Sequence, residues 1–155
     1  HEPYRRQRQM CIRDRSFIPV EGIFASVLPF LADRARIVCL IKPQFEAGRQ
    51  AVGKNGVVKD PKAHKQVLHA LLAFFAGQRC RLEQLTYSPI TGGEGNIEYL
   101  LHIRKPEEIS KEKLALTEHE AESALQTIIE EKTGLSYTPE WDAVIKGIVD
   151  NSHTL

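Results

Sequence analysis

Two charged side chains stand at positions where proteins commonly hold catalytic groups. Lys42 directly follows the short apolar run from Ile37 to Ile41, which predicts a buried strand with the lysine at its end. Glu98 lies in an alternating segment after a glycine-rich turn, where it projects opposite to Ile97 and Tyr99. An ammonium can stabilise developing negative charge, and a carboxylate can orient it. From these patterns alone, however, the simpler interpretation is that Lys42 is a strand-end lysine that reaches solvent and Glu98 an ordinary edge-strand carboxylate.

Three further cations gather in the segment that follows Lys42. Residues 43 to 59 show little periodicity and contain three glycines, which predicts a long basic loop. Its cations are Arg49, Lys54 and Lys59. Loops of this kind beside nucleic-acid sites hold RNA phosphates, although a solvated loop explains the same residues. The histidines His64, His69 and His102 lack a third ligand at a fitting spacing, so we expect no metal and structural roles for them.

The elements around these residues follow from hydrophobic periodicity. Apolar residues recur at helical spacing from Val20 to Leu31, where Pro29 should kink or tighten the last turn. The run from Ile37 to Ile41 is typical of a central parallel strand that is buried on both faces. Asp60 and Pro61 form a helix start, and Gly77 a plausible stop. Strands are expected at 80–87 and 97–103, with a turn at 92–96 between them. The buried stripe of the expected helix after Pro61 is Val67, Leu68, Leu71, Leu72 and Phe75.

The composition becomes charged and helical after Lys105 and Pro106. Thr117 and Glu120 form a capping box ahead of an apolar stripe that ends at Gly134. A second start at Thr138 and Pro139 precedes Trp141 and further apolar residues at helical spacing. Residues 105–155 are therefore predicted to form a helical hairpin that packs on the body or on a partner, with Trp141 in its core.

The first fifteen residues differ from the rest. They hold five arginines against Glu2 and Asp14, a local charge of +3, so the remainder of a chain that totals +1 carries about −2. The segment has no helical or strand periodicity, and we expect a non-native or disordered leader, with an RNA-binding arm as the alternative. The predicted domains are this leader at 1–15, an α/β body at 16–104 and the hairpin at 105–155.

Bulk composition excludes several classes. With 42% hydrophobic residues the chain can bury one ordinary core, and its remainder is not globally basic, so contact with RNA would have to come from local patches. The most apolar stretch, from Gly22 to Ile41, is interrupted by proline and charged residues, which predicts no membrane span. Cys11, Cys39 and Cys80 show no metal-ligand or CxxC spacing, which favours a reducing, cytoplasmic setting. We expect a monomer.

Three strings carry a resemblance to a known family. SFIPVEGIFASVLPFL, LIKPQFEAGRQAVGKNGVVKDPKAH and LTYSPITGGEGNIEYLLHI run from Ser16 to about Ile103. They resemble the TlyA family, haemolysin-named FtsJ-like enzymes that methylate ribose in ribosomal RNA. The resemblance implies the C-terminal half of a Rossmann-like S-adenosylmethionine-dependent methyltransferase fold, whose last two strands form an antiparallel hairpin at one edge of the sheet.

The resemblance also implies residue roles. Members of the family use a Lys-Asp-Lys-Glu tetrad, and the match assigns the second lysine to Lys42, the glutamate to Glu98 and the aspartate to Asp14. At Asp14 the match departs from the family, because Arg15 replaces a small apolar residue. The first lysine, the glycine-rich cofactor loop and the N-terminal RNA-binding domain have no match here, so we expect the chain alone to bind S-adenosylmethionine poorly and to be inactive. Cofactor-binding residues stay unassigned.

In the implied reaction the protein has to position the reacting groups and stabilise developing charge. A ribose 2′-hydroxyl is a weak nucleophile, so its proton must be removed or its developing oxyanion stabilised. Lys42 could act as a base only with a pKa far below the usual value of about 10.4, so we assign it to electrostatic stabilisation, with Glu98 orienting it. Two functions remain open: methyl transfer to a cytidine ribose of ribosomal RNA in the parent protein, and a non-catalytic RNA- or protein-binding α/β module. A glycine-rich turn upstream of Ser16 would favour the first, and a natural start codon near Ser16 the second.

Overall fold

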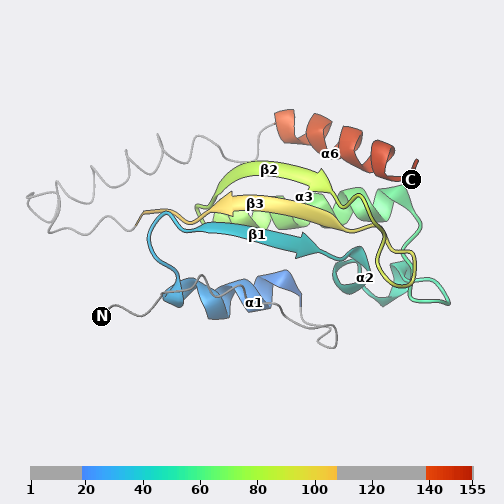
Figure 1. Ribbon diagram of the computed structural model, residues 1–155, viewed down its shortest axis with the longest axis horizontal. Helices are drawn as coiled ribbons and strands as arrows, with labels where there is room; N and C mark the ends of the chain where they lie inside the picture. Colours follow the sequence, from blue (N-terminus) through green and yellow to red (C-terminus); the bar gives the residue numbers. More distant parts are fainter. Residues whose placement is uncertain (1–18, 108–138, 155) are drawn as a thin grey trace, which may run out of the picture.

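One three-stranded antiparallel sheet with helices on one face forms the described part of the chain. The computed structural model describes residues 19–107 and 139–154 (Figure 1). The strands are β1 (Arg36–Ile41), β2 (Arg81–Tyr87) and β3 (Tyr99–Arg104), in the order β1-β3-β2. Both outer strands pair antiparallel with β3, so β1 and β2 run in the same direction. The mixed α/β class is confirmed, and so is the antiparallel hairpin of the last two strands.

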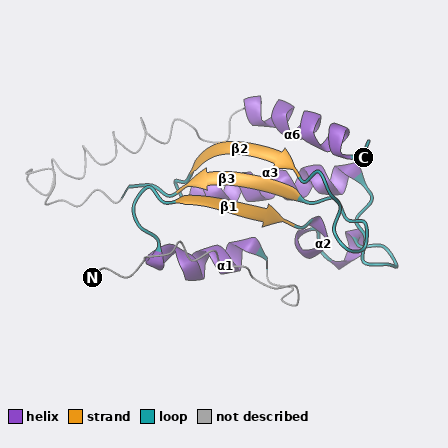
Figure 2. Cartoon of the chain, viewed as in Figure 1, coloured by secondary structure: helices purple, strands orange, loops and turns teal. Residues whose placement is uncertain are grey.

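Helix α3 (Pro61–Gly77) lies behind the sheet in Figure 2, extends along the strands and forms the centre of the core. It begins where the sequence predicts, because the Asp60 side chain accepts a hydrogen bond of 2.9 Å from the Lys62 amide and Pro61 occupies the first turn. The whole predicted stripe is buried. Gly77 is the last helical residue, but the left-handed residue after the helix is Arg79, with φ of 59°. The stripe packs on the inward residues of the sheet: Ile41, Leu82, Leu85, Tyr99, Leu101 and Ile103.

Helix α1 (Val20–Val27) continues into a 3₁₀ turn, η1 (Leu28–Phe30), that contains Pro29. The predicted tightening of the last turn is therefore confirmed. Phe24 is the buried anchor of α1, and its ring meets Phe74 and Phe75 of α3 edge to face at centroid distances of 6.0 and 5.0 Å. This contact ties α1 to α3 beside β1.

Two predictions for the segment around β1 are wrong. β1 is not a central strand buried on both faces: it pairs with β3 alone among the described residues, and Val38 and Leu40 are 66% and 44% exposed. An apolar run records the character of both faces but not which partners cover them. The loop from 43 to 59 also contains regular turns, α2 (Pro43–Glu46) and the 3₁₀ helix η2 (Arg49–Ala51), which are too short to produce a hydrophobic period.

The last helix, α6 (Pro139–Ser152), packs on α3 and β2. Ile145 and Val149 are fully buried in the same core as the sheet, and Trp141 packs partly buried against it. The predicted helix after Pro139 is confirmed, whereas Thr138 lies outside the described residues. The other helix of the predicted hairpin, from Thr117 to Gly134, lies outside the described residues, as does the leader. Within the described ranges, no helix has the length and apolar character that a membrane crossing needs.

Candidate active site

Lys42 and Glu98 meet because of the register between β1 and β3. Ile41 lies opposite Tyr99 at the end of the antiparallel ladder, so the next residue on one strand faces the preceding residue of the other. Lys42 Nζ lies 3.6 Å from Glu98 Oε1, and the two side chains are 25% and 13% exposed. A partly buried ion pair thus stands at the carboxyl end of β1. The expectation that the Glu98 carboxylate lies beside Lys42 agrees with this distance.

The Glu98 carboxylate passes close over Gly92. A Cβ built at this glycine would lie 2.7 Å from Glu98 Oε1 and 3.3 Å from its Cδ. The main chain of Glu98 is fixed as well, because its carbonyl accepts a hydrogen bond of 2.8 Å from the Ser88 amide. The missing side chain at position 92 therefore leaves room for the carboxylate in front of Lys42. The sequence indicated a turn here but gave no sign of this contact.

The short helix α2 contributes a contact to Lys42 and another to α1. Lys42 Nζ lies 5.9 Å from the centroid of the Phe45 ring, within the range of a cation–π contact. Glu46, one residue on, accepts a hydrogen bond of 2.9 Å from the Val20 amide at the start of α1. Burial raises the pKa of Glu46, an effect that the hydrogen bond from Val20 opposes. The short helix after Lys42 thereby holds α1 against the site.

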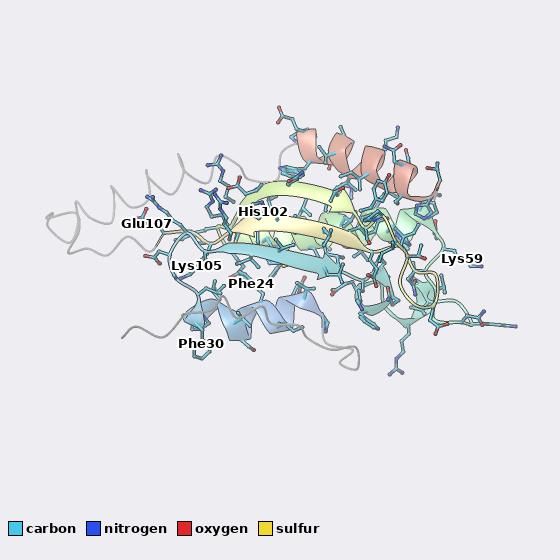
Figure 3. All side chains as sticks on the ribbon, in the orientation of Figure 1. Phe24, Phe30, Lys59, His102, Lys105 and Glu107 are labelled. Atoms are coloured by element: carbon cyan, nitrogen blue, oxygen red, sulfur yellow. The ribbon has the colours of Figure 1, made fainter. Side chains whose placement is uncertain are left out.

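The three basic-loop residues divide between two hollows. Lys54 and Lys59 line a hollow of about 630 Å³ between their loop and the glycine-rich turn, together with Asp60 and Glu94. Arg49 lines a second one of about 550 Å³ with Gln44 and Phe45. Figure 3 shows Lys59 at the end of the molecule where β1 ends, and His102 toward the other end of the sheet. Lys54, Lys59 and Arg49 are exposed.

Asn96 holds the basic loop to the glycine-rich turn. It is only 3% exposed, its Oδ1 accepts from the Val58 amide at 3.1 Å, and its Nδ2 donates to the Gly56 carbonyl at 3.0 Å. Its own carbonyl accepts from the Gly92 amide at 2.8 Å. Gly56 has φ of 74°, a left-handed conformation that glycine adopts without strain. Sequence reasoning missed Asn96, since one asparagine in a turn carries no signal of a contact 38 residues away.

The described thiols and histidines do not add a nucleophile or a metal centre. Burial raises the pKa of both Cys39 and Cys80 to about 11, which keeps these thiols protonated near neutral pH. No group of three potential metal ligands occurs within residues 19–107 and 139–154. Asp14, the aspartate that the resemblance assigned to the tetrad, lies outside the described residues.

Comparison with known proteins identifies the fold around this ion pair. The FtsJ-like methyltransferase family matches residues 9–105, which include all three strands, α3 and both members of the pair. The chain belongs to the FtsJ-like methyltransferase family. The resemblance drawn from the KPQFEAGR and GNIEYLL strings is thereby confirmed. α6 lies outside the matched residues.

Relatives of this FtsJ-like chain include proteins with names that refer to ribosomal RNA. It is 43% identical over 123 residues to YqxC of Bacillus subtilis, to which rRNA methyltransferase activity is attributed, covering 77% of this chain and 43% of YqxC. It is 33% identical over 95 residues to the 16S/23S rRNA (cytidine-2′-O)-methyltransferase TlyA of Mycobacterium tuberculosis, covering 61% and 35%. The chain thus spans less than half the length of both relatives.

A solved crystal structure has a similar fold. A crystal structure from Lactococcus lactis, described as that of a haemolysin, is 38% identical and superposes with a TM-score of 0.56, covering 74% of this chain and 52% of the other.

Proposed function

We propose that the protein to which this chain belongs transfers a methyl group from S-adenosylmethionine to a ribose 2′-hydroxyl of ribosomal RNA, with cytidine as the acceptor nucleoside. The observation that carries the proposal is the ion pair of Lys42 and Glu98, 3.6 Å apart at the end of β1, inside the segment that matches the methyltransferase family. The name of the mycobacterial relative supports the acceptor. Ribosomal RNA in the cytoplasm is then the partner.

Lys42 stabilises charge on the acceptor oxygen in this proposal. In the transfer the hydroxyl would lose its proton to solvent, its oxygen would bond to the methyl carbon, and the bond from that carbon to the donor sulfur would break. An ammonium within hydrogen-bond reach favours the negative charge that the oxygen carries after its proton has left and before the new bond is complete. The Glu98 carboxylate stabilises the charged form of the lysine, so Lys42 serves as a cation and not as the base. Because both side chains are mostly buried, their attraction is screened less than on the surface. Glu98 orients the ammonium.

S-Adenosylmethionine supplies the methyl group on a positively charged sulfonium, and the described residues do not form a site that fits it. The larger hollow contains the carboxylates of Asp60 and Glu94 but also Lys54 and Lys59, so its charge does not select a cation. The other has Arg49 in its wall and no carboxylate. We therefore assign no described residue to the donor and place only the acceptor side of the reaction here.

The exposed cations hold the RNA backbone in this proposal. Lys54 and Lys59 stand on the loop that Asn96 fixes beside Glu98, and Arg49 stands on the turn after α2. Phosphate contacts of this kind position a nucleic acid without reading its sequence. Each cation then contributes a salt-dependent share of the affinity.

The test is methyl transfer from labelled S-adenosylmethionine to ribosomal RNA by the full-length protein that contains this chain. Lys42→Ala should lower the rate by about 10² to 10³-fold, the usual effect of removing one group that stabilises an oxyanion. Lys62→Ala, which removes an exposed lysine at the start of α3, should retain the rate. Full activity of the Lys42 variant with an unchanged thermal transition would remove Lys42 from the mechanism.

A further inference from the structure

A buried series of hydrogen bonds joins the end of α6 to the basic loop. Its side chains are His64 of α3, Tyr99 of β3 and Ser152 of α6, and all three are 0% exposed. The Tyr99 hydroxyl lies 2.8 Å from His64 Nδ1 and 3.1 Å from Ser152 Oγ. On its other side His64 Nε2 lies 2.7 Å from the Val58 carbonyl. We call these four residues the α6–loop relay.

The chemistry at each end sets the direction of the bonds. The Val58 carbonyl can only accept, so His64 Nε2 carries a proton and donates to it. Burial lowers the pKa of His64, which keeps the ring neutral and leaves Nδ1 as an acceptor. The Tyr99 hydroxyl therefore donates to Nδ1, and burial raises the pKa of Tyr99 to about 12, so it keeps the proton that it donates.

Ser152 is the group that can donate to the Tyr99 oxygen once the tyrosine proton points at His64. Its hydroxyl also lies 2.8 Å from the Val149 carbonyl of its own helix and 3.4 Å from His153 Nδ1. That nitrogen donates to the same Val149 carbonyl at 2.9 Å, so the serine proton has two acceptors, the Val149 carbonyl and the Tyr99 oxygen. Donation to Val149 alone would leave lone pairs of Ser152 and Tyr99 facing each other at 3.1 Å. Donation to Tyr99 places a hydrogen between these two oxygens and leaves the Val149 carbonyl to accept from His153 Nδ1.

At its other end the relay reaches the candidate site through Val58. The carbonyl of this residue is held by His64, and its amide donates to Asn96 Oδ1. Asn96 in turn accepts at its carbonyl from Gly92, the residue that makes room for the Glu98 carboxylate. The loop between Gly53 and Lys59 is thus held between two buried side chains.

We propose that Ser152 is a positioning residue for the candidate site: by completing the relay, the docked α6 holds the Tyr99 hydroxyl and the His64 ring in place and, through Val58, the loop that carries Lys54 and Lys59. The α6–loop relay depends on α6, which lies outside the residues that match the methyltransferase family. The role of that loop in holding RNA rests on the proposed function, whereas the relay itself does not.

The test uses the full chain and two variants that each remove one hydroxyl bonded to the carbonyl three residues earlier. Ser152→Ala removes the buried one, and Thr154→Ala removes an exposed one at 2.6 Å from the Asn151 carbonyl. Amide hydrogen exchange should speed up on the order of tenfold at Val58 and Gly56 in the Ser152 variant, with little change at Leu101 in the middle of the sheet. The ¹⁵N shifts of the His64 ring should move as well. Thr154→Ala should change neither.

Tyr99→Phe interrupts the same relay at its middle and keeps the ring. It should speed exchange at Val58 to a similar extent, and adding Ser152→Ala to it should have little further effect, because both changes break one series of bonds. Equal acceleration at Val58 and Leu101 in the Ser152 variant, unmoved His64 shifts, or additive effects in the double variant would each overturn the proposal. These measurements need neither RNA nor methyl transfer, so a failure of the proposed function leaves their outcome unaffected.

Discussion

The position of the Glu98 carboxylate depends on a residue that has no side chain. Gly92 does not have the left-handed conformation that explains many glycines, since the positive φ angles of the described glycines are at Gly48, Gly56 and Gly95. What position 92 provides is space, because a Cβ there would stand 2.7 Å from Glu98 Oε1. A contact this short forces one of the two groups to move, and the flexible end of the glutamate moves more easily than the turn.

Gly92→Ala should therefore displace the carboxylate from Lys42 without unfolding the chain. In the full-length protein we expect methyl transfer to fall about tenfold or more, since a small misplacement of an orienting group is costly in catalysis. In the isolated chain, the ¹³C shift of the Glu98 carboxyl should change. The adjacent Gly93→Ala is the matched control, because a Cβ at Gly93 meets no atom within 4 Å. Equal behaviour of the two variants would show that Gly92 has no special role beside Glu98.

At the scale of elements, the connection from β1 to α3 has no hydrophobic periodicity that would fix its conformation. It is held in place by hydrogen bonds from Asn96 of the glycine-rich turn. Asn96 uses both ends of its carboxamide on this connection, one on the Val58 amide and one on the Gly56 carbonyl. The Gly53 amide donates to the Val57 carbonyl at 3.0 Å, which closes the tip. The cations of the loop owe their fixed place to these bonds.

Asn96→Ala should cost about 2 kcal/mol of unfolding free energy, since it removes two hydrogen bonds and leaves the Val58 amide without its acceptor in a buried position. Urea unfolding measures this loss. Asn55→Ala, which changes an exposed asparagine of the same loop, should lie within about 0.5 kcal/mol of the parent chain. If both variants have the parent stability, Asn96 does not hold the loop.

Elements with local causes were predictable, and those with distant causes were not. The start of α3 follows from Asp60 and Pro61 alone, and the 3₁₀ turn after α1 follows from Pro29, because each acts on its own neighbours. The edge position of β1 depends on which strands pair with it, and an apolar run does not contain that information. The same division applies to the site. Lys42 and Glu98 could be found from motif and strand ends, whereas the relay joins residues 35 and 53 positions apart.

At the scale of the whole molecule, one core joins three helices to one face of the sheet, and His64 lies inside it. Phe24 of α1, the stripe of α3 and Ile145 of α6 belong to the same buried cluster. The surroundings of His64 therefore depend on several elements being folded together, because they include Tyr99 of β3, His153 after α6 and Asp60 before α3. Its ring centroid lies 4.8 Å from that of His153.

The depressed pKa of His64 makes global stability dependent on pH in one direction. In the unfolded chain this histidine takes up a proton as pH falls through about 6.5, its ordinary value, while the folded state resists protonation until a lower pH. Below about 6.5 the unfolded state therefore binds more protons, and this contribution to stability is present above that pH and lost as pH falls toward the folded pKa. Burial is the main cause, and the repulsion from His153 adds to it, whereas the bond to Val58 and the charge of Asp60 oppose it.

Urea unfolding between about pH 8 and about pH 5.5 should show this loss, with a slope of up to about 1.4 kcal/mol per pH unit for one proton. His64→Gln removes the titrating group, so the variant should be less stable at pH 8 but should lose less stability over the same interval. His102→Gln, which changes a partly exposed histidine on the other face of the sheet, should keep the slope of the parent chain.

The carboxyl of Glu46 changes the stability in the opposite direction. Its pKa is raised in the folded state, so its contribution to stability is lost as pH rises through its titration, near and above its ordinary value of 4.5. Because both chains retain Glu46, the difference in slope between the parent chain and the His64 variant isolates His64. An unchanged slope in that variant would mean that the buried ring does not cause the loss of stability in acid.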